Sequence, residues 1–264
     1  MRLNILISCY NESVNGVPAV LLSPRQDVRY VVSHQMSAEY AGRGLPVPQE
    51  FRQRDDVLYA PFIGRGLSGN RNHAMDALAG WSLRDDDICI LADDDVRYRN
   101  EYFDTVLSTF VRHPELSLAA FRIRTPDGQP EFKKYPVEAF ELKSIPLTGG
   151  YYFSSVEIAF RFHAVKGIRF DTDFGLGSDK WPEGGEEAVF LSDCLKRGLR
   201  MGYFPEDAVI HGYMSSGKGR KTVRKARMML AVALRCRGPF SLEAVKGVLR
   251  VVWRRLSSPF RRDC

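Results

Sequence analysis

The sequence lacks any apolar run long enough to cross a bilayer, which takes about 20 residues. Its first residues, MRLNILISCYNE, also lack the apolar core of a signal peptide. Cysteine is sparse, and no C-x-x-C pair occurs among Cys9, Cys89, Cys194, Cys236 and Cys264. An odd and scattered set excludes a regular disulfide framework and predicts reduced thiols in a cytoplasmic protein.

Repeats and low-complexity tracts are absent too, and the 264 residues suffice for one sizeable core or two small domains. Charge is spread unevenly along the chain. Residues 1–216 hold 24 Lys and Arg against 30 Asp and Glu, whereas residues 217–264 hold 14 against 2. The chain is therefore an acidic body with a basic tail, a pattern that predicts attraction to an anionic surface, either lipid or nucleic acid.

Short apolar runs alternate with helical stretches in the first half of the chain. Strands are expected over residues 3–8, 28–33, 56–60, 87–92 and 116–123, and helices over residues 69–80 and 101–114. This alternation predicts an α/β fold with a mainly parallel sheet. Ligands of such sheets bind beyond the carboxyl ends of the strands, and two of these ends, ISCYNE and ILADDD, are polar.

Three adjacent aspartates, Asp93, Asp94 and Asp95, follow an apolar run. Like charges repel and acids are depleted from strands, so the triplet calls for an explanation. One interpretation is that one of the three aspartates caps the next turn or helix and that the other two are solvated. The other is a hard divalent cation, because Mg²⁺ or Mn²⁺ prefers oxygen ligands and often binds one or two carboxylates together with substrate phosphates. The spacing Asp93-x-Asp95 projects two carboxylates to one side of an extended segment.

Four segments in order, ISCYNE, GLSGNRNHA, ILADDDV and GGEEAVFLSDCLKRG, resemble a family 2 glycosyltransferase of the GT-A fold. The resemblance covers residues 1–216. It implies a GT-A type, Rossmann-like three-layer sandwich with a mainly parallel central sheet, to which the basic C-terminal helices of residues 217–264 are added. Within it, residues 1–123 would form the nucleotide-sugar-binding half and residues 124–216 the acceptor-binding half.

The resemblance also implies an activity. A family member would be an inverting glycosyltransferase that moves a sugar from a nucleoside-diphosphate donor, a UDP-sugar favoured, to a hydroxyl of a glycan or lipid-linked acceptor. A role in cell-surface polysaccharide synthesis follows. Negative charge builds on the departing diphosphate, which a divalent cation, Mn²⁺ or Mg²⁺, offsets as a Lewis acid.

Donor-binding residues are implied by position in the motifs. They are Ser8, Tyr10, Asn11, Glu12, Gln35, Ser68, Asn70, Arg71, Asp93 and Asp94. Arg71 would add a phosphate contact. The segment VVSHQ departs from the family, because Ser33, His34 and Gln35 stand where acidic residues usually contact the nucleoside. The base of the donor therefore stays open.

Metal and base positions are implied in the same way. Asp95 would be the direct metal ligand, with Asp93 beside it and His211 completing the shell, although a lone histidine is usually structural. The family's acidic pair matches Glu186 and Glu187, and we assign Glu187 as the base that deprotonates the acceptor, with Glu186 as the alternative. Both would lie in the first turn of a helix, where acids complement the helix dipole, so a structural role for one is expected.

The basic tail contains an amphipathic pattern. Apolar residues recur at helical spacing at Leu242, Val245, Val248, Leu249, Val252, Trp253 and Leu256, beside a basic stripe of Lys246, Arg250 and Arg254. A terminal helix packed on the body and a helix in an anionic membrane interface both fit this pattern. In the second case residues 241–262 would contact the inner face of the cytoplasmic membrane. Upstream, Lys218, Arg220 and Lys221 form either a solvated loop or a lid over the diphosphate.

Two other classes of function are open. GRGLSG matches G-x-G-x-x-G at Gly64, Gly66 and Gly69 and would serve an NAD(P)-dependent oxidoreductase, with Asp93 as the ribose-binding acid. The polar NRN that follows, where close packing favours small residues, argues against it. A non-catalytic basic protein that binds membrane or nucleic acid through its tail leaves the acidic motifs unexplained. No recognition motif for nucleic acid occurs, so no such partner is expected.

Overall fold

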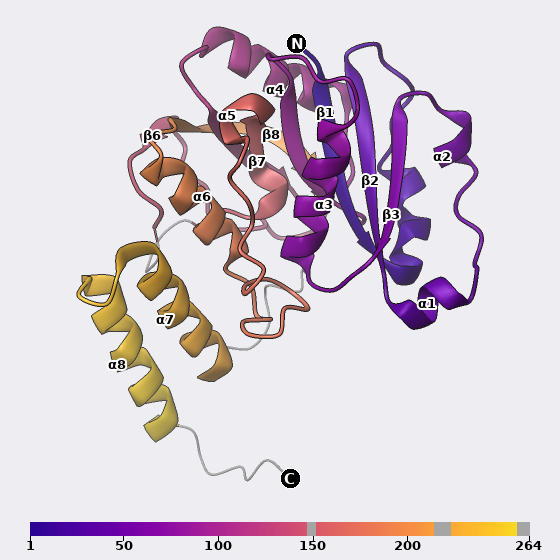
Figure 1. Ribbon diagram of the computed structural model, residues 1–264. Coiled ribbons are helices and arrows are strands. Elements are labelled where there is room, and N and C mark those ends of the chain that lie inside the picture. Colours follow the sequence, from indigo (N-terminus) through magenta and orange to yellow (C-terminus); the bar gives the residue numbers. More distant parts are fainter. Residues whose placement is uncertain (147–151, 214–222, 258–264) are drawn as a thin grey trace.

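The computed structural model describes residues 1–146, 152–213 and 223–257 (Figure 1). Its strands are β1 (Leu3–Tyr10), β2 (Val28–Met36), β3 (Val57–Ile63), β4 (Ile88–Asp93), β5 (Leu118–Arg124), β6 (Phe140–Leu142), β7 (Ile158–Arg161) and β8 (Met201–Ile210). Its helices are η1 (Asn11–Ala19), α1 (Ala38–Gly42), α2 (Glu50–Gln53), α3 (Leu67–Ala79), α4 (Asn100–Arg112), η2 (Ser155–Glu157), α5 (Phe162–Val165), α6 (Glu186–Lys196), α7 (Val223–Arg237) and α8 (Leu242–Ser257).

The described strands form one sheet in the order β3-β2-β1-β4-β7-β5-β8-β6. Parallel pairing joins β1 to β2 and β4, β2 to β3, and β5 to β8. Only β7, between β4 and β5, and β6, beside β8, run antiparallel to their neighbours. The expected α/β fold with a mainly parallel central sheet is confirmed.

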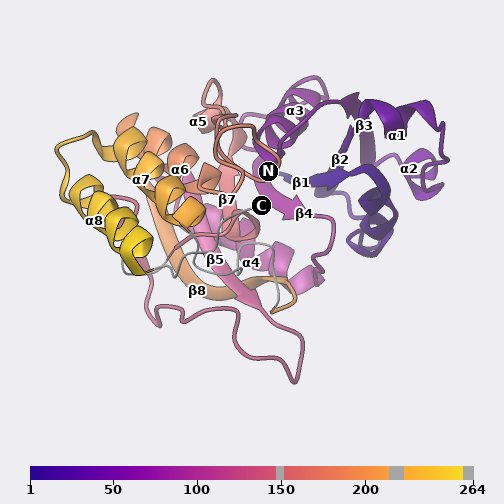
Figure 2. The same cartoon turned by 90° about the horizontal axis from the view of Figure 1, so that it is seen from below.

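Helices cover both faces of the sheet, which makes three layers. In β1, Leu3, Ile5 and Ile7 pack in one cluster with η1 and α4, whereas Leu6 packs on the other face with α3 and α6. Figure 2 shows α3 and α4 on opposite sides of the sheet. A strand that is apolar on both faces needs helices on both sides, so the continuous apolar run of β1 accounts for this layering.

Several elements run further than their local pattern predicts. The strands β2 and β3 continue to Met36 and Ile63, and α3 begins at Leu67 rather than at residue 69. Pro61 lies within β3, where it is tolerated because β3 is an edge strand. The 3₁₀ helix η1 was not expected, since its segment NESVNGVPA has no helical period of apolar residues.

The pairing register brings the polar strand ends together. Ser8 of β1 lies opposite Asp93 of β4, and Tyr10 lies opposite Gln35 of β2. Because these three strands are parallel, their carboxyl ends share one edge of the sheet. The sheet therefore presents the ends of ISCYNE, VVSHQ and ILADDD side by side.

The tail residues that the structure describes form a helical hairpin beside α6 (Figure 1). Helix α7 packs on α6 through Met228, Val232 and Cys236, which contact Val189, and α8 packs on α7. No helix in the described part of the chain is both long and apolar enough to span a membrane. Residues 217–222 and 258–264 of the expected tail lie outside the described residues.

One sheet passes through both expected halves of the body, so the division at residues 123 and 124 into donor and acceptor halves stays a prediction. The cysteines that the structure describes, Cys9, Cys89, Cys194 and Cys236, are buried and free, as expected of reduced thiols. Cys264 lies outside the described residues.

Candidate functional site

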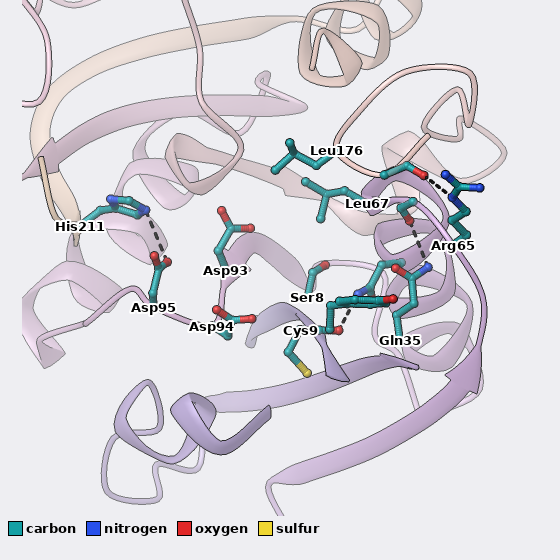
Figure 3. Close-up of a pocket in the computed structure, with 14 residues that line it drawn as sticks. Ser8, Cys9, Gln35, Arg65, Leu67, Asp93, Asp94, Asp95, Leu176 and His211 are labelled. Carbon is teal, nitrogen blue, oxygen red and sulfur yellow. Dashed lines mark hydrogen bonds and ion pairs between the residues drawn. The ribbon is translucent and has the colours of Figure 1, made fainter. Parts of the chain in front are cut away.

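A cavity of about 600 Å³ opens at the carboxyl ends of β1, β2 and β4 (Figure 3). Its lining comprises Ser8, Cys9, Tyr10, Gln35, Arg65, Gly66, Leu67, Asn70, Asp93, Asp94, Asp95, Leu176, Gly177 and His211. This edge is where open α/β sheets bind ligands. The three aspartates, placed together by the end of β4 and the turn after it, therefore face a space that can hold a ligand.

Asp95 and His211 meet in this cavity, with 3.4 Å between Asp95 Oδ1 and His211 Nε2. His211 follows β8, and a backbone bridge between Arg97 and Ile210 holds the end of β8 beside the segment after β4. The Nδ1 atom of His211 lies 2.7 Å from the carbonyl oxygen of Gly212. With Nδ1–H donating to this carbonyl, protonated His211 also donates Nε2–H to Asp95, whereas the neutral imidazole presents the Nε2 lone pair to the cavity, the arrangement typical of a metal-binding imidazole.

The charges at this end of the cavity influence one another. A hydrogen bond from His211 lowers the pKa of Asp95. Burial would lower the pKa of His211, but its bonds to Asp95 and to the Gly212 carbonyl raise it overall. Desolvation in the cavity raises the pKa of Asp93, although Arg71 opposes the shift. Asp93 and Asp95 therefore differ in their tendency to carry charge.

Asp94 is held by a contact outside the cavity as well as by its place in the lining. Its carboxylate accepts a hydrogen bond from the hydroxyl of Ser13 in η1. Burial, followed by repulsion from Asp93 and Asp95 and opposed by this bond, raises the pKa of Asp94 to about 6. Asp94 therefore ties the turn after β4 to η1 while it also lines the cavity.

The donor atoms of Asp93, Asp95 and His211 suit a divalent cation such as Mn²⁺, which accepts both carboxylate oxygen and imidazole nitrogen. Across the described residues, no three acidic, histidine or cysteine side chains already converge as a metal cage. A cation here would need oxygens from a ligand to complete its shell. Diphosphate oxygens have that chemistry.

Arg71 of α3 is 2% exposed and does not line the cavity. Its guanidinium lies 3.0 Å from Glu186 Oε1, 3.6 Å from Glu187 Oε1 and 3.8 Å from Asp93 Oδ1. Desolvation would lower the pKa of Arg71, but the three carboxylates outweigh it and raise the pKa. A buried cation thus joins the aspartate motif to the acidic pair on α6.

The acidic pair itself divides into two environments. Glu186 is buried and hydrogen-bonded to Arg71, whereas the side chain of Glu187 is 19% exposed. Both follow Gly185, whose φ of 94° turns the chain into α6. Burial, and then the charge of Glu186, raise the pKa of Glu187 to about 8, while Arg71 opposes the shift. Glu186 has the features of a structural partner of Arg71, and Glu187 those of a group that can exchange a proton near neutral pH.

The structure brings most of the predicted donor-binding residues to the cavity. Those that line it are Ser8, Tyr10, Gln35, Asn70, Asp93 and Asp94. Two of them have buried polar atoms, Ser8 Oγ and Asn70 Oδ1, for which the described residues supply no hydrogen-bond partner. Buried polar atoms are rarely left unpaired, so these two are free to bond a ligand.

The remaining predicted donor-binding residues lie outside the cavity lining. Ser68 is buried and donates to the carbonyl of Phe174, which holds the glycine-rich loop before α6. The side chain of Asn11 accepts from the backbone N–H of Ser37. Glu12 is exposed and lies 3.5 Å from Arg43. In this structure these three side chains are engaged with other parts of the protein, and their direct role in donor binding stays a prediction.

Six lining residues lie outside the predicted donor and metal sets, namely Cys9, Arg65, Leu67, Leu176, Gly177 and Gly66, the last of which belongs to the oxidoreductase alternative. Most come from two loops that meet across the cavity, where the N–H of Leu67 donates to the carbonyl of Leu176 and Arg65 Nε donates to that of Gly177 (Figure 3). The sequence gives one signal for this wall, the long glycine-rich segment before α6, which is typical of a binding loop. No pattern in the sequence predicts that this segment contacts the loop before α3. The proposed lid residues Lys218, Arg220 and Lys221 lie outside the described residues.

The glycine loop of the oxidoreductase alternative lies in a different topology from a dinucleotide site. There, the ribose-binding acid ends a strand next to the one that leads into the glycine loop. Here Gly64, Gly66 and Gly69 follow β3, and β2 and β1 separate β3 from the Asp93 strand β4. This arrangement argues against an NAD(P) site built from these residues.

Comparison with known proteins adds evidence on the fold. No family model and no curated protein matches the chain. Solved structures do match, among them S. aureus TarS 1-349, with a TM-score of 0.60, 14% identity, and coverage of 97% of this chain and 72% of that one. The same fragment in complex with UDP-GlcNAc matches with a TM-score of 0.56 and 14% identity, over 97% of this chain and 73% of that one. In complex with UDP it matches with a TM-score of 0.56 and 14% identity, over 98% of this chain and 72% of that one.

At this level of identity the match shows the fold. The mixed α/β sheet described above, mostly parallel, has the Rossmann-like architecture of the GT-A fold. The fold implied by the sequence motifs is therefore confirmed. Membership of family 2 stays a prediction.

Proposed function

We propose that this protein is a metal-dependent, inverting glycosyltransferase that moves a sugar from a nucleoside-diphosphate donor to an acceptor hydroxyl. One observation carries the proposal: Asp95 meets His211 in a cavity at the strand ends of a GT-A fold, Asp93 lines the same cavity, and the buried Arg71 joins Asp93 to an acidic pair. A diphosphate and a cation account for acids crowded in a cavity, where a purely structural site would neutralise them.

The donor would lie against the strand ends, with its diphosphate towards Asp95 and His211. Ser8 and Asn70 have buried polar atoms available for hydrogen bonds to it. A divalent cation, Mn²⁺ or Mg²⁺, held by Asp95, Asp93 and His211, would offset the charge that builds on the departing diphosphate. Arg71, in contrast, is engaged with three carboxylates, and we assign it to positioning them rather than to binding phosphate.

Glu187 is our candidate for the general base. It would take the proton of the acceptor hydroxyl as that oxygen attacks the anomeric carbon and the bond to the diphosphate oxygen breaks. A single displacement from the face opposite the leaving group inverts the anomeric centre. Glu186 is less suited to the role, because it is buried against Arg71 at 3.0 Å.

A UDP-sugar is the favoured donor, since the neighbouring TarS fragment has been crystallised with UDP-GlcNAc and with UDP. The acceptor that we propose is a glycan or a lipid-linked sugar of a cell-surface polysaccharide, with transfer in the cytoplasm at the membrane. Residues at the end of β2 differ from the acidic residues of the resembling family, so the donor base has to be found by measurement.

Calorimetric titration with UDP, GDP, dTDP, CDP and NAD, each with Mn²⁺ and with EDTA, tests this proposal. We expect one diphosphate to bind only with metal. Tight NAD binding that is indifferent to EDTA would contradict the proposal and revive the oxidoreductase alternative. Absence of binding by every nucleotide would also contradict it and leave the tail as the functional part.

A further inference from the structure

Large apolar side chains are concentrated on the outside of the α7–α8 hairpin. Of the sixteen large hydrophobic side chains that are exposed in the described part of the chain, eight lie there: Leu234, Phe240, Leu242, Val245, Val248, Leu249, Val252 and Trp253. Leu249 and Trp253 are 63% and 68% exposed. Exposed apolar patches of this kind mark surfaces that meet another partner.

Helix α8 does not use this face to pack on the protein. It contacts α7 through small residues: Ala244 is 1% exposed, and a side chain at Gly247 would lie 3.0 Å from Leu230 of α7. Leu242, Val245 and Leu249 recur at intervals of three and four and so lie along one side of the helix, away from Ala244 and Gly247. The helix thus packs with its small residues and exposes its large ones, the reverse of a terminal helix that only completes a core.

The charge around this face is of one sign. Residues 223–257 contain nine Lys and Arg against a single acid, Glu243. Lys246 is exposed one position after Val245, and the half-buried Arg250 follows Leu249, so the two border one edge of the apolar face. On α7, Arg224 and Arg227 are exposed as well. A second copy of this surface would bring like charges together, whereas an anionic lipid surface satisfies both the charge and the apolar side chains.

We propose that the apolar face of α8, defined by Leu242, Val245, Leu249, Val252 and Trp253, docks the protein on an anionic lipid bilayer. The apolar side chains enter the boundary between head groups and acyl chains, and Lys246 and Arg250 contact lipid phosphates. This inference goes beyond transfer chemistry, and it holds or fails independently of the proposed function.

Docking by α8 would also fix the orientation of the candidate site. Helix α7 packs against α6 at Gly185, where a Cβ would lie 2.6 Å from Val232, directly before the acidic pair. Arg235 of α7 adds ion pairs to Asp193 at 2.8 Å and to Asp171 at 3.1 Å. Because α8 rests on α7 and α7 rests on α6, a bilayer under α8 holds the N-terminus of α6 at a set height. A lipid-linked substrate would meet the site in one orientation.

Vesicle flotation of the full chain tests this proposal. The two vesicle types are pure phosphatidylcholine and phosphatidylcholine with roughly one-third phosphatidylglycerol. We expect binding to the anionic vesicles, weakened by about 0.5 M salt, where screening is strong. Leu249→Glu should lower partitioning at least about tenfold, because it removes one apolar side chain from the interface. Lys246→Gln with Arg250→Gln should lower it less and reduce the salt dependence.

Val111→Glu is the matched control, since Val111 is 65% exposed on α4 at a site away from the hairpin. It should bind vesicles as the unaltered protein does. Trp253 provides a direct readout, because its fluorescence should shift to shorter wavelength on anionic vesicles and Trp253→Phe should lose that shift while it still floats.

Three results would overturn the proposal. One is equal loss of vesicle binding in Val111→Glu and Leu249→Glu. Another is no vesicle binding by a protein that light scattering shows to be a dimer and that Leu249→Glu separates, which would make the face an interface between two copies. The third is tight binding of an oligonucleotide with no binding to either vesicle.

Discussion

The cavity at the strand ends and the α7–α8 hairpin both hold side chains that folding alone would place elsewhere. In the cavity, acids from β4 and from α6 are crowded around Arg71, at distances of 3.0 to 3.8 Å. On the hairpin, large apolar side chains face outward beside basic ones. The first region has charges that are partly paired within the protein, and the second has an apolar face without a partner among the described residues.

This difference indicates how each region meets its partner. A site with partly compensated charge is prepared for a small charged ligand, whose cation and diphosphate complete the balance. An apolar and basic face that spans a helix is suited to an extended surface instead. Chemistry and docking would thus reside in separate parts of the chain, joined through the packing of α7 on α6.

Glu187→Gln should distinguish the cavity from the hairpin most strongly, because it should lower catalysis and leave vesicle binding unchanged. If Glu187 is the base, kcat should fall by roughly 10²- to 10⁴-fold, the usual contribution of a general base. Nucleotide binding, measured by calorimetry, should stay unchanged, and so should flotation with anionic vesicles. Glu183→Gln, an isosteric change in the loop just before α6, is the control and should retain kcat. A Glu187→Gln enzyme with full kcat would remove Glu187 from the mechanism.

Asp95→Asn should weaken metal-dependent nucleotide binding by about 100-fold, since loss of even an outer partner of a metal ligand costs roughly 10- to 100-fold in affinity. Asp85→Asn, in the exposed segment before β4, is the matched control and should bind as the unaltered protein does. Equal affinities for the two variants, measured by calorimetry with Mn²⁺, would place the metal elsewhere.

Arg71→Met should destabilise the body by about 3 kcal/mol, because it leaves Glu186 buried without its cation. Arg71→Lys keeps the positive charge and should therefore lower the free energy of unfolding by less than Arg71→Met does. Urea unfolding gives the free energies. The loss should shrink as the pH falls, since protonated carboxyl groups no longer need the cation. A loss below about 0.5 kcal/mol, the range of a neutral surface change, would show that Arg71 does not hold the acids together.

The pH profile tests the state of Glu187. A base acts in its deprotonated form, and burial together with Glu186 raises the pKa of Glu187 to about 8. The value of kcat/KM should therefore rise about tenfold per pH unit below that pKa and level off above it. Because Arg71 opposes the rise in this pKa, Arg71→Lys, with its looser contact, should move the profile to higher pH. A profile that is flat across this range would contradict the assignment.

The smallest effect is expected on the hairpin. Leu249→Ala should change the free energy of unfolding by less than about 0.5 kcal/mol, as for other exposed side chains. Phe190→Ala, in the core of α6 where Phe190 stacks on Phe170, should cost about 3 to 5 kcal/mol. Thermal or urea unfolding measures both. A large loss for Leu249→Ala would mean that the face is covered by protein in solution, against the docking proposal.

Local patterns in the sequence predicted the parts of the fold that depend on neighbouring residues. The apolar run of β1, the helical spacing of α3 and the amphipathic period of α8 are all visible within short stretches, and each forms the expected element. The three aspartates were predicted to face a ligand, and they line the cavity.

Contacts between distant segments were beyond such patterns. No local signal places β7 between β4 and β5, or Arg71 against Glu186, which lies 115 positions further along the chain. The motif around Arg71 predicts a phosphate contact, which stays a prediction, but it carries no sign of the burial of Arg71, because that burial depends on how α3 and α6 meet. Likewise, helical spacing identified both faces of α8 but could not say that the small residues pack and the large ones stay exposed.

A crystal grown with UDP and Mn²⁺ tests the central claim most directly, because the anomalous signal of manganese locates the ion. We predict a peak between the carboxylate of Asp95 and Nε2 of His211, with diphosphate oxygens completing the shell and the uridine near Ser8 and Gln35. Manganese or nucleotide bound away from the ends of β1 and β4 would contradict the account.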